Sequence, residues 1–230
     1  MNYETIELKN VTVNIKSDND PGSPREWVNL GTMVCWNRRY NLGDKNYFTN
    51  PEDFQEWVKE NKSIVLPLYL YDHSGITMST TSFSCQWDSG QVGYIYVTYE
   101  DIKKEYGWKY ITIARIKKIT EYLKNEVSIY DDYLTGNVYG YVTTCNNCNN
   151  EIDSCWGFYG SDFKENGLLD SIDDTCDDCK SINERLEYIR QEIIKESVSY
   201  SELAELQSLK EYINNDTLLS EWAGIPEGKG

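Results

Sequence analysis

Hydrophobic residues alternate in short runs through the first two thirds of the chain, and this spacing predicts strands. Residues 4–15 alternate partly, which is typical of a strand pair or of one long bent strand. Residues 64–71 are apolar almost throughout, which predicts a buried strand in which Pro67 requires a bulge or an edge position. In residues 91–99 both alternating sets are apolar, so we expect a central strand with both faces covered.

Three segments between or after these strands show helical spacing. Asn50 is a suitable N-cap and Pro51 suits the first helical position, so a helix is predicted over 51–61. Residues 100–106 and 111–126 also predict helices, and the second of these carries an apolar stripe on one face.

The end of the chain predicts a helical hairpin. Ser181-Ile-Asn-Glu184 and Ser199-Tyr-Ser-Glu202 both match the capping box, and apolar residues at helical spacing follow each of them. Together the patterns predict an α+β fold, mainly an antiparallel sheet with interspersed helices. The expected parts are an α+β core at 1–143, a continuation of that core with a cysteine-rich insertion at 144–180, and an acidic helical hairpin and tail at 181–230.

Composition predicts a folded protein outside the membrane. Nineteen Tyr and seven Trp among 230 residues argue against disorder. No apolar stretch approaches the roughly twenty residues that a membrane helix needs. The first residues, Met1 to Glu4, show no signal-peptide pattern, so we expect a cytoplasmic protein with no membrane partner.

Charge is unevenly distributed. Lys and Arg number 22 against 38 Asp and Glu, a net charge of −16, and residues 149–230 hold seven basic and nineteen acidic residues, a net charge of −12. Such a surface repels phosphates, so direct binding of nucleic acid is not expected. One interpretation is that the charge serves solubility alone. The alternative is that the acidic face occupies a basic, nucleic-acid-binding surface on another protein.

Two short cysteine pairs carry the most specific chemistry. Cys145 and Cys148 lie in the loop between strands predicted over 137–143 and 152–158, and Cys176 and Cys179 precede the helical hairpin. Four thiolates at this spacing predict a closed, tetrahedral site of the zinc-knuckle kind, with structural Zn²⁺.

Other interpretations of the cysteines stay open. Disulfides or separate buried thiols are possible, but the odd count of seven and the absence of a signal peptide favour a reducing compartment. A redox dithiol is disfavoured because neighbouring acidic residues would raise a thiol pKa. Cys155 lies between the two pairs beside Trp156 and Phe158, so we expect a small core residue, although it could replace a ligand.

Catalytic residues are harder to find in this sequence. His73 is the single histidine and follows Asp72, so it could be a base oriented by a carboxylate, with Cys35 or Cys85 as nucleophile. A hydrogen-bonded turn histidine after a core strand is the favoured interpretation, and both cysteines look buried.

Two further groups of charged residues stay open as ligand sites. Arg38 and Arg39 could grip a carboxylate or phosphate, but they are as well explained as partners of local acids. Two acidic groups could bind a hard cation, although neither matches the spacing of a calcium loop: Asp131 with Asp132, and Asp170 with Asp173 and Asp174.

Several motifs occur in order between Asn29 and Gly160. They are NLGTMVCWNRRYNLGD, LPLYLYDHSGI, WDSGQVG, YLTGNVYGY and DSCWGFYG. In these motifs the chain resembles a family of uncharacterised proteins from bacteriophages and mobile elements. The resemblance implies a phage or mobile-element origin, and hence the cytoplasm of a host bacterium, and it assigns no catalytic residues.

The resemblance and the charge together favour a binding protein over an enzyme. The expected function is an anti-defence inhibitor that binds a host defence protein or nucleoprotein complex stoichiometrically, by mimicry of nucleic acid. The residues expected to bind this partner are Asp173, Asp174, Asp177, Asp178, Glu184, Glu187, Glu202 and Glu205.

Two alternative functions remain. The first is a small hydrolase or transferase with a site on the loops that carry Asp72, His73, Arg38, Arg39 and Asp88. The second is a structural or assembly protein of the phage.

Overall fold

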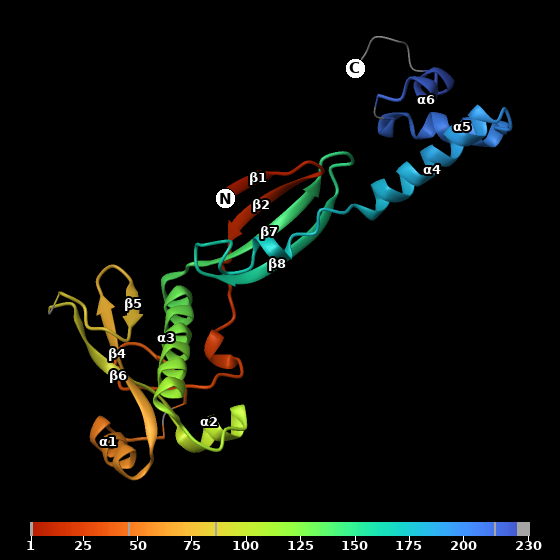
Figure 1. Ribbon diagram of the computed structural model, residues 1–230. Coiled ribbons are helices and arrows are strands. Elements are labelled where there is room, and N and C mark those ends of the chain that lie inside the picture. The colour runs from red at the N-terminus through yellow and green to blue at the C-terminus, as the bar shows by residue number, and fades with distance from the viewer. Residues whose placement is uncertain (1, 46, 86, 214, 225–230) are drawn as a thin grey trace. The chain divides into compact units, whose positions relative to one another are not determined.

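The computed structural model describes residues 2–45, 47–85, 87–213 and 215–224, and it has an α+β fold with two antiparallel sheets (Figure 1). Contacts divide the chain into two compact units. Unit 1 comprises residues 1–16, 140–155 and 168–230, and unit 2 comprises residues 17–139 and 156–167. This grouping by contact does not test the three predicted sequence ranges, which stay a prediction.

Unit 2 contains a sheet in the order β3-β6-β4-β5. Its strands are β3 (Thr32–Cys35), β4 (Ser63–Asp72), β5 (Ile76–Ser79) and β6 (Ser89–Thr98). β6 lies between β3 and β4 and pairs antiparallel with both, so the expected central strand is confirmed. Gly93 of β6 is required here, because a Cβ would lie 2.0 Å from the Val34 carbonyl oxygen of β3.

Pro67 is tolerated in β4 because the neighbouring strand is short. β5 pairs only with Tyr69–Asp72, so β4 is an edge strand at Pro67 on that side. The register against β6 also shifts between Leu68 and Tyr69, which marks an irregularity beside the proline.

Helices cover both faces of this sheet. The helices of unit 2 are η1 (Pro24–Glu26), α1 (Pro51–Glu60), α2 (Tyr99–Tyr106) and α3 (Ile113–Thr135). α3 lies along the sheet in Figure 1 and buries Ile119, Leu123 and Val127 in the main core. On α1, Phe54 and Trp57 pack against tyrosines of β6, and the Asn50 side chain caps the helix as its sequence predicts.

α3 continues nine residues beyond its predicted end at residue 126. Asp131 and Asp132, two of the candidate ligands for a hard cation, therefore lie in its last turns. The Asp131 carboxylate accepts hydrogen bonds from the Thr77 hydroxyl at 2.7 Å and the Met78 N–H at 2.6 Å. These bonds join α3 to β5, and Gly136 ends the helix in the left-handed conformation.

Unit 1 is built around a second sheet, in the order β1-β2-β7-β8. Its strands are β1 (Asn2–Glu7), β2 (Val11–Ser17), β7 (Val138–Cys145) and β8 (Glu151–Tyr159). The last residue of β2, the first two of β7 and the last four of β8 belong to unit 2. The predicted strand pair at residues 4–15 is confirmed by the register of β1 and β2.

A small helical cluster follows the second sheet. Its elements are α4 (Asp177–Ile194), α5 (Tyr200–Ser208), η3 (Lys210–Tyr212) and α6 (Thr217–Trp222), and the short η2 (Leu169–Ser171) precedes them in the chain. Leu186, Ile189 and Ile193 of α4 pack against Leu206 of α5 and Leu219 of α6. The predicted hairpin is thus accompanied by α6, a third helix that the sequence pattern did not indicate.

The two predicted capping boxes have different outcomes. The Ser199–Glu202 box is present at the start of α5. The Ser181–Glu184 box is wrong, because α4 begins four residues earlier and Ser181 lies inside it. Asp177 and Asp178 occupy the first turn of α4, where their charge complements the positive end of the helix dipole.

Candidate metal centre

The two cysteine pairs meet within unit 1. The ligand atoms of Cys145, Cys148, Cys176 and Cys179 all lie within 4.8 Å of one another, and this is the one such group of three or more metal-ligating side chains in the part of the chain that the structure describes. The Sγ atoms of Cys145 and Cys179 are 3.6 Å apart, and those of Cys148 and Cys176 are 3.7 Å apart. Metal–sulfur bonds of about 2.3 Å in a tetrahedron give sulfur–sulfur edges of about 3.8 Å. Two of the six sulfur–sulfur edges therefore match those of a tetrahedral metal site, and the others lie within 4.8 Å.

The first pair is positioned by the β7–β8 turn. Cys145 is the last residue of β7, and its N–H donates to the Asn150 carbonyl at 2.9 Å. The N–H of Asn146 donates to the Asn10 carbonyl, also at 2.9 Å, which ties the turn to the loop between β1 and β2. The N–H groups of Asn147 and Cys148 point at the Cys145 sulfur.

The second pair is positioned by the start of α4. Cys176 is the N-cap residue and Cys179 lies in the first turn, so the helix itself sets their separation. The backbone N–H of Cys179 donates to the Cys176 sulfur, as Cys148 does to Cys145 in the first pair. Each pair thus supplies one sulfur that a backbone N–H stabilises in its anionic form.

The thiols differ in acidity. Burial acts to raise the pKa of Cys145, but the N–H groups of Cys148 and Asn147 and the nearby thiols outweigh it and lower the pKa to about 7. Burial and the neighbouring sulfurs raise the pKa of Cys179. Anionic sulfurs repel one another. When four thiols share a small volume without a cation, ionisation of one of them therefore raises the pKa of its neighbours. Four close cysteines could therefore hold a metal ion.

The remaining cysteines lie outside this cluster. Burial, followed by the charge of Asp44, raises the pKa of Cys35 to about 12, which opposes a role as nucleophile. Cys85 is half-buried and lies 3.8 Å from the Asp88 carboxylate. Cys155 is exposed, so its expected core position is wrong: β8 is the outermost strand of its sheet, and exposed residues run from Ser154 to Gly157.

The catalytic candidates form an open group on the loops of unit 2. His73 Nδ1 lies 3.2 Å from an Asp88 carboxylate oxygen, and the His73 side chain is 63% exposed. Asp72 accepts from Arg39 at 2.9 Å and from the Tyr40 hydroxyl at 3.1 Å. Arg38 is exposed. The structure brings four of the candidates into pairs, but none of the cavities described here is lined by them.

The acidic candidates occupy two different settings in unit 1. Asp173, Asp174, Asp177, Asp178, Glu184 and Glu187 are exposed around the start of α4. Glu202 is engaged in the capping box, and Glu205 forms a two-point ion pair with Arg185 at 2.9 and 2.8 Å. The charge available to a partner is therefore concentrated near the cysteine cluster rather than on α5.

A cavity of about 570 Å³ lies beside the cysteine cluster. Cys145, Cys176 and Cys179 contribute to its wall, as do Glu184 and Glu187 of α4. Acidic side chains therefore border the cysteine cluster.

Unit 2 contains a buried ion network that the sequence pattern did not predict. The Arg25 guanidinium contacts Asp44 at 2.6 Å and Glu126 at 3.0 Å, and the Arg25 and Glu126 side chains are 5% and 7% exposed. Asp44 also accepts from the Met33 N–H, and Glu126 accepts from the N–H groups of Leu30 and Gly31. These contacts fix the segment that leads into β3 and give the three charges a structural role.

We compared the chain with known protein families, curated proteins and solved structures. No family model, curated protein or solved structure matches this chain. Among the described residues, no helix has the length and apolar character needed to cross a membrane.

Proposed function

We propose that the four cysteines hold one Zn²⁺ with a structural role. Zinc suits four thiolates in a tetrahedron, and a site filled by four protein ligands leaves no position for substrate or water. The observation that supports this is the 3.6 and 3.7 Å sulfur–sulfur separation. The ion would join the β7–β8 turn to the start of α4 and so fix the acidic surface that begins there.

The acidic surface next to this centre would bind a basic surface on a partner protein. We define it by the exposed side chains of Asp174, Asp177, Asp178, Glu184 and Glu187. Among the described residues, the one ion pair that reaches this set is a 3.9 Å contact between Glu187 and Arg190. Carboxylates with so little local compensation are available for intermolecular pairing, which would speed association and make it sensitive to salt.

The partner class follows from the phage resemblance. A host defence protein that binds nucleic acid presents a basic groove, and an array of carboxylates can occupy it in place of phosphates. The protein would then act in the host cytoplasm as a stoichiometric, anti-defence inhibitor that mimics nucleic acid.

The test compares binding by two variants of equal charge change. The surface variant combines Asp174→Asn, Asp177→Asn, Asp178→Asn and Glu184→Gln, and the control combines Glu52→Gln, Glu56→Gln, Glu100→Gln and Glu105→Gln in exposed positions of unit 2. The full-length wild-type chain should recover a defence nuclease or its complex from infected cells at a one-to-one ratio.

The proposal predicts that recovery weakens as salt rises, disappears with the surface variant and persists with the control. Equal recovery by both variants would contradict it. Protection of the phage that is lost on substitution of His73 and Arg39 by Ala would instead favour the hydrolase or transferase alternative, for which the His73–Asp88 pair is the supporting contact.

A further inference from the structure

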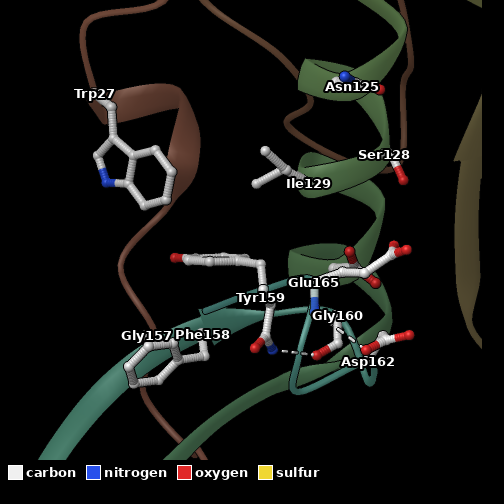
Figure 2. Close-up of a pocket in the computed structure, with 12 residues that line it drawn as sticks. Trp27, Asn125, Ser128, Ile129, Gly157, Phe158, Tyr159, Gly160, Asp162 and Glu165 are labelled. Atoms are coloured by element: carbon white, nitrogen blue, oxygen red, sulfur yellow. Dashed lines mark hydrogen bonds between the residues drawn. The ribbon is translucent and has the colours of Figure 1, made fainter. Parts of the chain in front are cut away.

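A second cavity of about 570 Å³ lies within unit 2, between η1, α3 and the end of β8 (Figure 2). We call it the β8 pocket. Its volume is typical of sites for small ligands. All of its lining residues belong to unit 2, so a ligand bound there would contact neither the cysteine cluster nor the acidic surface of unit 1.

Aromatic side chains form one wall of the β8 pocket. The rings of Trp27 and Tyr159 meet edge to face, with centroids 5.1 Å apart and planes 88° apart. The Tyr159 hydroxyl donates to the Gly22 carbonyl, which holds this ring across the pocket. Figure 2 shows the Tyr159 ring below the Trp27 indole, with the Ile129 side chain extending toward the space between them. Trp27 is 50% exposed, so much of its surface is available to a ligand.

Carboxylates form the opposite wall. Asp132 extends from α3, and Asp162 and Glu165 come from the turn that follows β8. Asp162 accepts from the N–H groups of Lys164 and Glu165 at 3.1 Å each, which fixes the turn. Among the residues in the described ranges, no Lys or Arg forms an ion pair with any of these three carboxylates.

Gly160 allows the chain to pass close to Asp132. Its φ of +91° is a conformation that favours glycine, and a Cβ there would lie 3.4 Å from Asp132 Oδ2. Burial, followed by the charge of Asp131, raises the pKa of Asp132, as expected for a carboxylate that lacks a cationic partner. The backbone is thus arranged around a partly buried acid at the edge of an aromatic wall.

We propose that the β8 pocket binds a guanidinium or alkylammonium group carried on a short aliphatic stem. The cation would lie over the aromatic wall and pair with the carboxylates, while the stem would contact Ile129 and the rings. An anion would be repelled by three like charges. A neutral apolar ligand would cover the carboxylates without pairing them, which is costly.

Titration calorimetry with three probes tests this proposal on the full-length protein. Agmatine represents a free organic cation, Nα-acetyl-arginine amide represents the same group in a peptide, and Nα-acetyl-citrulline amide is the uncharged isostere of the second probe. We expect at least one cationic probe to bind and the citrulline probe to bind about tenfold more weakly or not at all. Binding by agmatine alone assigns the site to a free metabolite, and equal binding by the arginine amide assigns it to a peptide side chain.

Variants locate the binding. Glu165→Gln, Asp132→Asn and Trp27→Ala should each weaken the cationic probe about tenfold, whereas Glu56→Gln, an equal charge change on the exposed face of α1, should not. Circular dichroism establishes whether each variant is folded. Glu165 lies in an exposed turn, so Glu165→Gln still tests cation binding if the other two variants do not fold. Absence of binding by both cationic probes at millimolar concentration, equal binding of the citrulline probe, or an equal effect of Glu56→Gln would overturn the proposal.

Discussion

Arg25 organises the polar interior of unit 2. Its guanidinium makes two hydrogen bonds to Asp44, one to Glu126 and one to the Gly31 carbonyl. Burial opposes the charge of Arg25, but Asp44 and Glu126 more than compensate and raise its pKa. The carboxylates of Asp44 and Glu126 both pair with this one guanidinium. Removal of Arg25 therefore leaves negative charge in the protein interior without a cationic partner.

Replacement of Arg25 by Ala should therefore destabilise unit 2 by about 3–5 kcal/mol, since breaking a buried pair from one side leaves an uncompensated charge. Arg38→Ala removes the same side chain from an exposed position and should change stability by less than about 0.5 kcal/mol. Urea unfolding followed by circular dichroism measures both. Equal midpoints for the two variants would show that the Arg25 network carries no net stability.

Cys35 should be unreactive in the folded protein. With a pKa of about 12, its thiolate fraction at pH 8 is about one in ten thousand. Iodoacetamide at pH 8 should label the exposed Cys155 quickly and Cys35 only after unfolding, as peptide mass spectrometry would reveal. Fast labelling of native Cys35 would contradict the burial described here and reopen its role as a nucleophile.

At the scale of elements, local signals were enough wherever a helix start is set by its own side chains. Asn50–Pro51 and Ser199–Glu202 are such cases. The Ser181–Glu184 pattern failed because the N-cap residue of α4 is Cys176, five residues before Ser181. The Arg25–Glu126 contact joins residues 101 positions apart, and no periodicity encodes such a distance. The two cysteine pairs could be assigned to one site from their spacing alone, because a tetrahedral metal ion needs four ligands and each pair supplies two.

Two serines with the same sequence pattern should consequently behave differently. Ser199→Ala should destabilise α5 by about 1 kcal/mol, because the Ser199 hydroxyl accepts from the Glu202 N–H. Ser181→Ala should have little effect, or a slightly stabilising one, because Ser181 lies in a helix interior. Hydrogen exchange of the amides in residues 200–208 and 182–194 measures both, and an equal response would contradict the boundaries given for α4 and α5.

The Ser199 contribution should also depend on pH. Hydrogen bonds from Ser199 lower the pKa of Glu202 below its ordinary value. The stabilisation is therefore present above the unfolded pKa of this carboxyl and is lost as pH falls through the lower, folded value. The difference between wild type and Ser199→Ala should shrink accordingly on acidification.

At the scale of the whole molecule, the cysteine cluster links parts of unit 1 that are distant in sequence. Residues of the β7–β8 turn and of α4 contribute two sulfurs each. The main core of unit 2 contains none of the four, since its buried side chains come from the β3-β6-β4-β5 sheet, from α2 and α3, and from Leu42 in the loop after β3. Loss of the metal should therefore affect the two units unequally.

The double variant Cys145→Ser, Cys176→Ser should increase hydrogen exchange in residues 140–155 and 168–194 and leave β4, β6 and α3 protected. Cys155→Ser is the matched control, because Cys155 is exposed and outside the cluster. Uniform loss of protection throughout the chain would indicate that the units do not respond separately to the cluster.

The most direct measurement is the metal content of the untagged, full-length protein purified without chelators, determined by plasma mass spectrometry. We predict about one zinc per chain in the wild type, the same content in Cys155→Ser and almost none in the double variant Cys145→Ser, Cys176→Ser. Wild-type protein without bound zinc that keeps α4 protected from exchange would contradict this prediction.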